Sequence, residues 1–128
     1  KNIQYIYKVE NPETTLMLDR SQIEQVLINL LKNAGEACVE QIYPEVIIST
    51  HYDLEKHLFF LSVCDNGSGI LPEVLDKIFV PFFTTKPTGS GIGLSLCKQI
   101  MNLHGGSISA SSEIGKGSCF TLKFLCCG

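Results

Sequence analysis

Apolar residues recur at every second position in some segments of this chain and about every three and a half positions in others. The first pattern predicts strands and the second predicts helices. Apolar residues at every second position predict a strand over residues 3–9, and Asn11-Pro12 ends it. A second short strand is predicted over 15–18. Two pairs of further strands, each joined by a short polar or glycine turn, are predicted over 46–52 and 58–64 and over 107–111 and 118–125.

Helical spacing occurs in three segments. The first begins at a cap, either Asp19 or Ser21, and keeps its apolar positions three and four apart up to Cys38. Pro72 begins a short helix predicted over 72–79, and a third helix is predicted over 91–103. Gly105-Gly106 ends the third helix, and residues 80–90 lack periodicity and are predicted to form a loop.

The order of these elements predicts an α+β fold. Strands in adjacent pairs favour antiparallel pairing, and the helices must bury their apolar stripes on the sheet. We therefore expect a two-layer α/β sandwich, with a mixed, mostly antiparallel sheet of about five strands covered on one face by about three helices. Because neither a linker nor a repeat interrupts residues 1–128, we expect a single domain.

Composition narrows the function classes. The formal charge of −3 disfavours a nucleic-acid partner bound to a basic face. The sequence has no apolar run long enough to cross a bilayer and no signal peptide. The chain begins with Lys1 rather than Met, so we expect a domain excised from a longer protein, which leaves the membrane state of the parent open.

Six cysteines are present, but none forms a CxxC pair or lies at zinc-ligand spacing from a histidine. We therefore expect reduced cysteines in a cytosolic protein, without structural disulfides. His51 and His57 fall in predicted strands and His104 at a helix end, and we interpret all three as structural.

A polar stripe accompanies the apolar face of the first helix: Gln22, Asn29, Asn33, Glu36 and Glu40. Asparagine costs about 0.5–0.7 kcal/mol relative to alanine in a helix interior, so two asparagines four residues apart are unexpected on a plain solvated face. An amide oxygen at this position can complete the oxygen shell of Mg²⁺, which takes few protein ligands besides phosphate and water. The solvated face stays open as the alternative.

Two glycine segments are candidate ligand loops. In 65–70, Asp65 follows an apolar strand, where its carboxylate can accept a hydrogen bond from an amine such as that of adenine. Gly67 and Gly69 permit close backbone approach, although an ordinary Asn-Gly turn is the alternative. In 89–94, glycine N–H groups ahead of a helix form an anion site. Neither the dinucleotide fingerprint nor the P-loop pattern fits this segment.

The remaining two segments are less specific. Residues 79–86 place three phenylalanines before the glycines, which suggests a mobile lid with aromatic anchors, and Lys86 can meet a phosphate. A surface loop held by packing of Phe79 and Phe82 is the alternative. Residues 115–120 are interpreted as a hairpin turn that enters a strand, with Lys116 and Phe120 in structural roles.

These five segments, in this order across roughly residues 15–125, resemble the ATPase domain of sensor histidine kinases, within the superfamily of gyrase, heat-shock chaperone and MutL ATPases. The run Pro-Phe-Phe-Thr-Thr-Lys at 81–86 is similar to the nitrogen-regulation and sporulation kinases. The resemblance implies ATP and Mg²⁺ as cofactors. It implies catalytic roles for Asn29, Asn33 and Lys86, with Asn33 on the metal and Asn29 near the phosphates.

The resemblance also implies the nucleotide contacts. Asp65 binds the adenine amine, and Ser118 supports the adenine from the last strand pair. The other implied contacts are Gly67 and Gly69 behind Asp65; Ile70, Ile78 and Leu94 around the adenine ring; Thr85 and Lys86 in the lid; and Gly89, Ser90, Gly91, Ile92 and Gly93 around the triphosphate. Glu36 stands where many relatives carry a phosphate-binding lysine, and we expect Lys86 or Lys32 to compensate.

The activity implied by this resemblance is transfer of the γ-phosphoryl group of Mg-ATP to a histidine on a separate dimerisation domain. A response regulator would act downstream, and the fragment would be monomeric within a homodimeric parent. Gyrase-type members carry a glutamate in place of Asn29, and asparagine is no general base, which favours transfer over hydrolysis. The alternatives are an ATP hydrolase or serine kinase of the same superfamily, and a catalytically silent nucleotide-gated interaction module.

Overall fold

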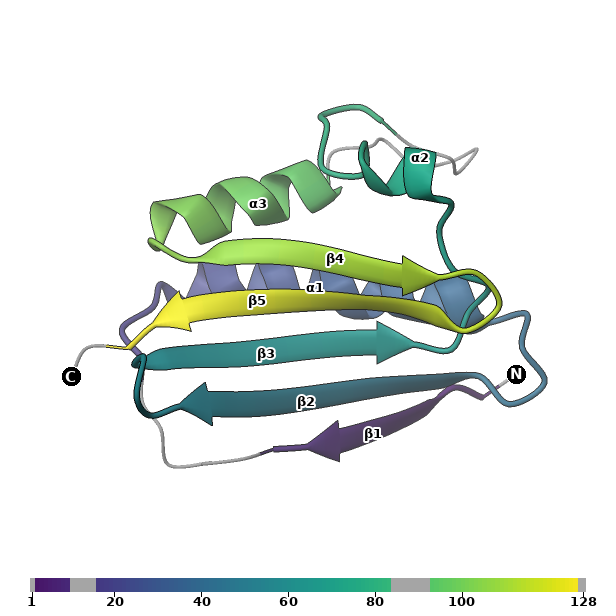
Figure 1. Cartoon of the computed structure of the whole chain (residues 1–128), viewed down its shortest axis with the longest axis horizontal. Helices are drawn as coiled ribbons and strands as arrows, with labels where there is room; N and C mark the ends of the chain where they lie inside the picture. The colour runs from purple at the N-terminus through teal and green to yellow at the C-terminus, as the bar shows by residue number, and fades with distance from the viewer. Residues whose placement is uncertain (1, 10–15, 84–92, 127–128) are drawn as a thin grey trace.

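The computed structural model describes residues 2–9, 16–83 and 93–126. A five-stranded sheet forms one layer, and the first helix, α1, lies behind it in the view of Figure 1. The elements in chain order are β1 (Gln4–Lys8), α1 (Arg20–Cys38), β2 (Glu45–Asp53), β3 (Leu58–Asp65), α2 (Pro72–Leu75), α3 (Gly93–Leu103), β4 (Ser107–Glu113) and β5 (Gly117–Leu125).

The strand order in the sheet is β1-β2-β3-β5-β4, and only the β1–β2 pair is parallel. The predicted α+β sandwich with a mixed, mostly antiparallel sheet is therefore confirmed. The short strand predicted over 15–18 is wrong for residues 16–18, which form no strand, and residue 15 lies outside the described residues. Leu16 and Leu18 instead pack against the core as the chain enters α1.

The start of α1 is fixed by two contacts. Asp19, rather than Ser21, is the N-cap, and its carboxylate accepts a hydrogen bond from the backbone N–H of Gln22 at 3.1 Å. The backbone N–H of Asp19 donates to His104 Nε2 at 3.0 Å, and His104 Nδ1 lies 2.9 Å from the carbonyl oxygen of Ile100. His104 therefore joins the end of α3 to the start of α1, which is the structural role expected of it.

Of the other two helices, α2 is shorter than predicted, whereas α3 agrees with its prediction over the described residues. α2 ends at Leu75, and the residues up to Phe79 form turns. α3 is described from Gly93, because residues 91 and 92 lie outside the described residues. His57 lies in the β2–β3 turn with a φ of 54°, so its predicted place in a strand is wrong. The turn reverses the chain in four residues and leaves no strand position for it.

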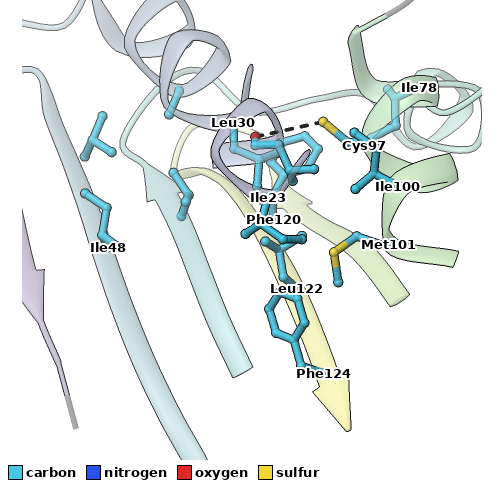
Figure 2. Close-up of a cluster of buried hydrophobic side chains, with 14 of the residues drawn as sticks. Ile23, Leu30, Ile48, Ile78, Cys97, Ile100, Met101, Phe120, Leu122 and Phe124 are labelled. Atoms are coloured by element: carbon cyan, nitrogen blue, oxygen red, sulfur yellow. Dashed lines mark hydrogen bonds between the residues drawn. The ribbon is translucent and has the colours of Figure 1, made fainter. Parts of the chain in front are cut away.

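The core lies between the sheet and the helices α1 and α3. Figure 2 shows Leu30 of α1, Phe120 of β5 and Met101 of α3 in this layer. Leu30, Met101 and Leu122 have no solvent exposure. Burial of one such side chain contributes about 1.5–3 kcal/mol, so this layer holds α1 and α3 in fixed positions on the sheet.

Apart from the partly exposed Cys126, the described cysteines divide into two groups. Cys38 and Cys97 are buried thiols in the core, as expected of small hydrophobic residues. Cys64 and Cys119, however, form a disulfide between β3 and β5, so the expectation of reduced cysteines without a disulfide is wrong for this pair. They lie 55 residues apart in the chain but directly opposite each other in the antiparallel register. The spacing of the cysteines in the sequence does not indicate this proximity, which follows from the pairing of β3 with β5.

Candidate functional site

Asp65 and Ser118 are the two buried polar side chains in the described part of the chain, with exposures of 8 % and 5 %. Asp65 ends β3, and Ser118 lies opposite it near the start of β5. Asp65 Oδ1 accepts the backbone N–H of Gly67 at 2.9 Å. Burial raises the pKa of the Asp65 carboxyl above its ordinary value, and the backbone N–H groups of Gly67 and Ser118 oppose this effect only in part.

A hydroxyl chain extends from Ser118 towards the segment after β3. Ser112 Oγ donates to the carbonyl oxygen of Gly117 at 3.1 Å and accepts the backbone N–H of Ile70 at 2.7 Å. Ser118 Oγ lies 2.9 Å from Ser112 Oγ. Because the single proton of Ser112 is used on Gly117, Ser118 is the donor in this contact. Ser112 was missed by the sequence analysis, although it lies opposite Ser118 across the predicted hairpin.

Gly67 and Gly69 hold the segment after β3 close to its neighbours. A Cβ at Gly67 would lie 2.3 Å from the carbonyl oxygen of Ala37, in the last turn of α1. Gly69 has a φ of +88°, and a Cβ there would lie 2.6 Å from the carbonyl oxygen of Glu113. Both positions therefore show the close backbone approach expected of them, between the end of α1 and the β4–β5 turn.

Asn66, directly before Gly67, has a different role. Its Oδ1 accepts the backbone N–H of Glu45 at 2.9 Å, and its Nδ2 donates to the carbonyl oxygen of Tyr43 at 2.8 Å. The side chain therefore ties the segment after β3 to the start of β2. This arrangement holds Asp65 at the strand end from a second direction.

The polar stripe of α1 divides into a half-buried and an exposed part. Asn29 and Asn33 are half-buried, whereas Glu36 and Glu40 are exposed. Asn29 Nδ2 donates to Cys97 Sγ on α3 at 3.7 Å, and Asn29 Oδ1 would be 3.8 Å from a Cβ at Gly93. The side chain of Asn29 therefore points to the start of α3, where the predicted glycine segment leads into the helix.

Cys97 is fixed in turn by α1. Its Sγ donates to the carbonyl oxygen of Val26 at 3.9 Å, the contact drawn as a dashed line in Figure 2. Burial raises the pKa of the Cys97 thiol, and the Asn29 contact opposes this only in part. A protonated thiol can donate to Val26 while its sulfur accepts from Asn29.

The predicted apolar wall joins the core. Ile78 is buried, and Ile70 and Leu94 are partly buried residues packed against the core cluster. These three residues come from the segment after β3, the turns after α2 and the start of α3. Together with Asp65, they place apolar and polar groups on the same side of the sheet as α1.

The phenylalanines of the predicted lid differ in their surroundings. Phe79 packs edge-on against Phe120, with ring centroids 6.4 Å apart, and Lys98 Nζ lies 5.8 Å from the Phe79 ring centroid. Phe82 is 74 % exposed and has a φ of 68°. Phe79 therefore fits the alternative of a loop held by packing. The structural roles expected in the β4–β5 turn also hold, since Lys116 pairs with Glu113 at 3.5 Å and Phe120 is buried.

The rest of the predicted site lies outside the described residues, namely Thr85, Lys86, Gly89, Ser90, Gly91 and Ile92. A groove of about 430 Å³ on the outer side of α3 includes none of the predicted nucleotide residues, and its lining is Phe79, Pro81, Ser95, Lys98, Gln99, Asn102 and Leu103. Within the described ranges, no three His, Cys, Asp or Glu side chains gather in a way that could hold a metal. No helix in this described part of the chain has the length and apolarity that crossing a membrane requires.

Comparison with known proteins extends this picture. The sensor protein FixL of Bradyrhizobium diazoefficiens is 36 % identical over 94 % of this chain and 24 % of its own length. The chain thus spans about a quarter of the length of the curated relatives it matches. The nucleotide-free catalytic domain of the histidine kinase ThkA superposes with a TM-score of 0.83 at 34 % identity, over 95 % of this chain and 79 % of that one.

Two further structures bear on ligands and partners. Full-length ShkA in complex with AMPPNP is 25 % identical, with a TM-score of 0.83, over 98 % of this chain and 26 % of its own. ThkA in complex with the response regulator TrrA matches at 33 % identity and a TM-score of 0.78, over 95 % and 34 % of the chains. Residues 18–126 match the family described as histidine kinase-, DNA gyrase B- and HSP90-like ATPase, and the chain belongs to this family.

Proposed function

We propose that this chain binds Mg-ATP and donates the γ-phosphoryl group to a histidine on a separate dimerisation domain, as the ATP-binding domain of a sensor histidine kinase. Membership of the ATPase family and similarity to sensor kinases support this function. The observation that carries the proposal is the buried Asp65 at the end of β3, held opposite Ser118 and beneath the last turns of α1.

Asp65 has the chemistry that adenine recognition requires. The carboxylate is an acceptor only, so it can take a hydrogen bond from the exocyclic amine but would repel the carbonyl at the same position of guanine. Burial strengthens such a bond, because water no longer competes for it. Ile70, Ile78 and Leu94 would supply the apolar walls that a purine ring needs.

The phosphates would lie towards α1 and the start of α3. Asn29 points to this region, and Asn33 lies one turn further along the same face. The amide oxygen of Asn33 fits the donor set of Mg²⁺, which needs no cluster of protein carboxylates when phosphates and water complete its shell. When bound, the ion would neutralise charge on the phosphate oxygens. Thr85, Lys86, Gly89, Ser90, Gly91 and Ile92 are proposed to close over the triphosphate.

This arrangement favours transfer rather than hydrolysis. Neither Asn29 nor Asn33 can take a proton from water at neutral pH. We infer that α1 orients and neutralises the phosphates, while the imidazole of the partner domain is the nucleophile. His51 lies in β2, His57 in the β2–β3 turn and His104 at the end of α3, and none has an acceptor motif, so we infer that the acceptor belongs to another domain.

The proposal extends to the parent protein. ThkA is seen with a response regulator, and we propose a response regulator as the downstream partner here. We also propose that the domain works in the cytoplasm, as a monomer by itself and within a dimer in the parent. Contact with nucleic acid or with the membrane is not part of the proposed role.

The test mixes this chain with a dimerisation domain from a related sensor kinase and ATP labelled at the γ-phosphate. Label on the histidine of the added domain is expected, and Asp65→Asn should abolish it. Asp53→Asn is the matched control, because it also removes one carboxylate, but at the end of the β2–β3 pair opposite to Asp65. Release of inorganic phosphate without an acceptor would favour a hydrolase. Label on a serine would favour a serine kinase, and ATP binding without any transfer would favour an interaction module.

A further inference from the structure

The disulfide lies directly behind the proposed nucleotide site. Cys64 precedes Asp65 on β3, and Cys119 follows Ser118 on β5. Successive side chains of a strand point to opposite faces of the sheet. Asp65 and Ser118 therefore face the helices, while the two sulfurs lie on the other face, one residue further along the same pair of strands.

The sulfurs are open to reagents from solvent. Both cysteines are half-buried, whereas Cys38 and Cys97 are fully covered by the core. The described helices pack on the opposite face of the sheet. On the sulfur side, the next cross-strand pair is polar, with Ser62 Oγ 3.0 Å from Thr121 Oγ1. A small oxidant or a dithiol reductant can therefore reach Cys64 and Cys119 before it reaches the other two.

The state of this pair bears on the strand ends that carry Asp65 and Ser118. The Cα atoms of Cys64 and Cys119 are 4.0 Å apart, so two non-bonded sulfurs at this position would have to separate by rotation or by movement of the strands. Movement of the strands at this pair would reach Asp65 directly through the start of β5. A Cβ at Gly117 would lie 2.0 Å from the carbonyl oxygen of Asp65, so the start of β5 already touches the end of β3.

We propose that Cys64 and Cys119 form a reversible thiol–disulfide site that sets the nucleotide affinity of the domain, with the disulfide form binding more tightly. This inference rests on the proposed function, because it places the affected ligand at Asp65. Disulfides in reducing compartments are mostly transient and redox-sensing, which agrees with a regulatory pair. The surrounding contacts described above, from Ser112, Asn66 and Gly67, belong to the disulfide form.

The chemistry balances with a peroxide as oxidant. The thiolate of one cysteine attacks a peroxide oxygen, which yields a sulfenic acid and hydroxide. The second thiolate attacks that sulfur, forms the S–S bond and expels a second hydroxide. Overall, two thiols lose two electrons and two protons, and hydrogen peroxide becomes two water molecules. A dithiol reductant restores both thiols by exchange and is itself oxidised to a disulfide.

The test measures both the pairing and the affinity. This chain is treated with hydrogen peroxide or with dithiothreitol, remaining thiols are alkylated, and mass spectrometry identifies the protected cysteines. Mg-ATP affinity is then measured by calorimetry in both states. Protection of Cys64 and Cys119 is expected after peroxide, with affinity on the order of fivefold tighter than in the reduced state. The double variant Cys64→Ser, Cys119→Ser should show no dependence on the reagent.

Three controls keep the outcomes distinct. The single variants Cys64→Ser and Cys119→Ser should each lose the dependence, and they replace the double variant if it fails to fold. Cys126→Ser keeps the pair and should respond as the wild type does. Equal affinity in a proven disulfide and a proven dithiol form, or the absence of the Cys64–Cys119 bond after peroxide, would overturn the proposal. Failure of both forms to bind Mg-ATP would refute the proposed function itself, and the alkylation result would still judge the pairing.

Discussion

Asn29 on α1 donates its side-chain amide to the thiol of Cys97 on α3, across 3.7 Å. The two residues are 68 positions apart in the chain, and the packing of α1 on α3 brings them together. The same thiol donates to the carbonyl oxygen of Val26, one turn earlier on α1. The orientation of the proposed phosphate-side asparagine therefore depends on a neutral sulfur in the core.

This contact predicts different effects for two substitutions of Cys97. Cys97→Ala removes both hydrogen bonds and leaves a small void, so we expect a loss of about 1–2 kcal/mol in the free energy of unfolding. The rate of phosphoryl transfer should fall as well, because Asn29 is no longer held. Cys97→Ser keeps a donor and an acceptor and should restore part of the transfer rate. Equal rates for Cys97→Ala and the wild type would show that the contact does not position Asn29.

Replacement of Asn29 tests why this chain would transfer phosphate rather than hydrolyse ATP. Asn29→Glu introduces a carboxylate that can accept a proton from water, and general-base catalysis contributes typically about 10²–10⁴-fold. We expect the variant to release inorganic phosphate from ATP faster than the wild type does. Asn29→Gln, which lengthens the side chain without a titratable group, is the control and should not gain this activity. A comparable gain in Asn29→Gln would exclude the general-base explanation.

Replacement of Asp65 separates stability from nucleotide binding. Asp65→Asn keeps an oxygen that can accept the N–H of Gly67, but its amide group would face the adenine amine as a second donor. We expect Mg-ATP affinity to fall by at least about tenfold, the value of one hydrogen bond to a charged group. Calorimetry measures this loss, and affinity equal to that of the wild type would refute the adenine contact.

The same substitution tests the pH dependence that the Asp65 carboxyl gives to the stability of the wild type. Burial raises the pKa of Asp65 above its ordinary value of 3.8, so the folded state binds the proton more tightly than the unfolded state. As the pH rises from 3.8 through the raised pKa, the wild type loses stability relative to Asp65→Asn and does not regain it above that range. Urea unfolding of both proteins in acidic and neutral buffers measures the difference. A wild type that gains relative stability over this range would contradict the direction.

Much of the fold could be predicted because its signals are local. The helical spacing from Ile23 to Cys38 and the cap at Asp19 are enough to define α1, and the hairpin of β4 and β5 follows from its glycine turn. The strand predicted over 15–18 failed because Leu16 and Leu18 alternate as a strand does, while the adjoining helix cap determines the path of the chain.

The candidate site was predictable in its residue types but not in its contacts. Asp65, Gly67 and Gly69 stand out in the sequence because a carboxylate and glycines follow an apolar strand. The contribution of Ser112 depends on the register of β4 with β5, and the partnership of Asn29 with Cys97 depends on helix packing. Likewise, the Cys64–Cys119 pair arises from the adjacency of β3 and β5, which are not consecutive in the chain. Such long-range neighbours leave no periodic signal.

Gly67 should tolerate no side chain, for a reason that differs from backbone conformation. A Cβ there would lie 2.3 Å from the carbonyl oxygen of Ala37, and a backbone atom in the last turn of α1 cannot move aside as a flexible side chain would. We expect Gly67→Ala to lower the free energy of unfolding by about 1–3 kcal/mol, the usual cost of overpacking.

Gly93→Ala is the matched control for this prediction, because a Cβ at Gly93 would meet only ordinary contact distances, with Asn29 Oδ1 at 3.8 Å. Its stability should stay close to that of the wild type, since Gly93 lies in α3 and alanine has a higher helix propensity than glycine. Urea unfolding compares the two variants under one set of conditions. Equal stability of Gly67→Ala and Gly93→Ala would mean that the segment after β3 packs more loosely against α1 than the contact with Ala37 requires. That result would contradict the role of this segment in holding Asp65.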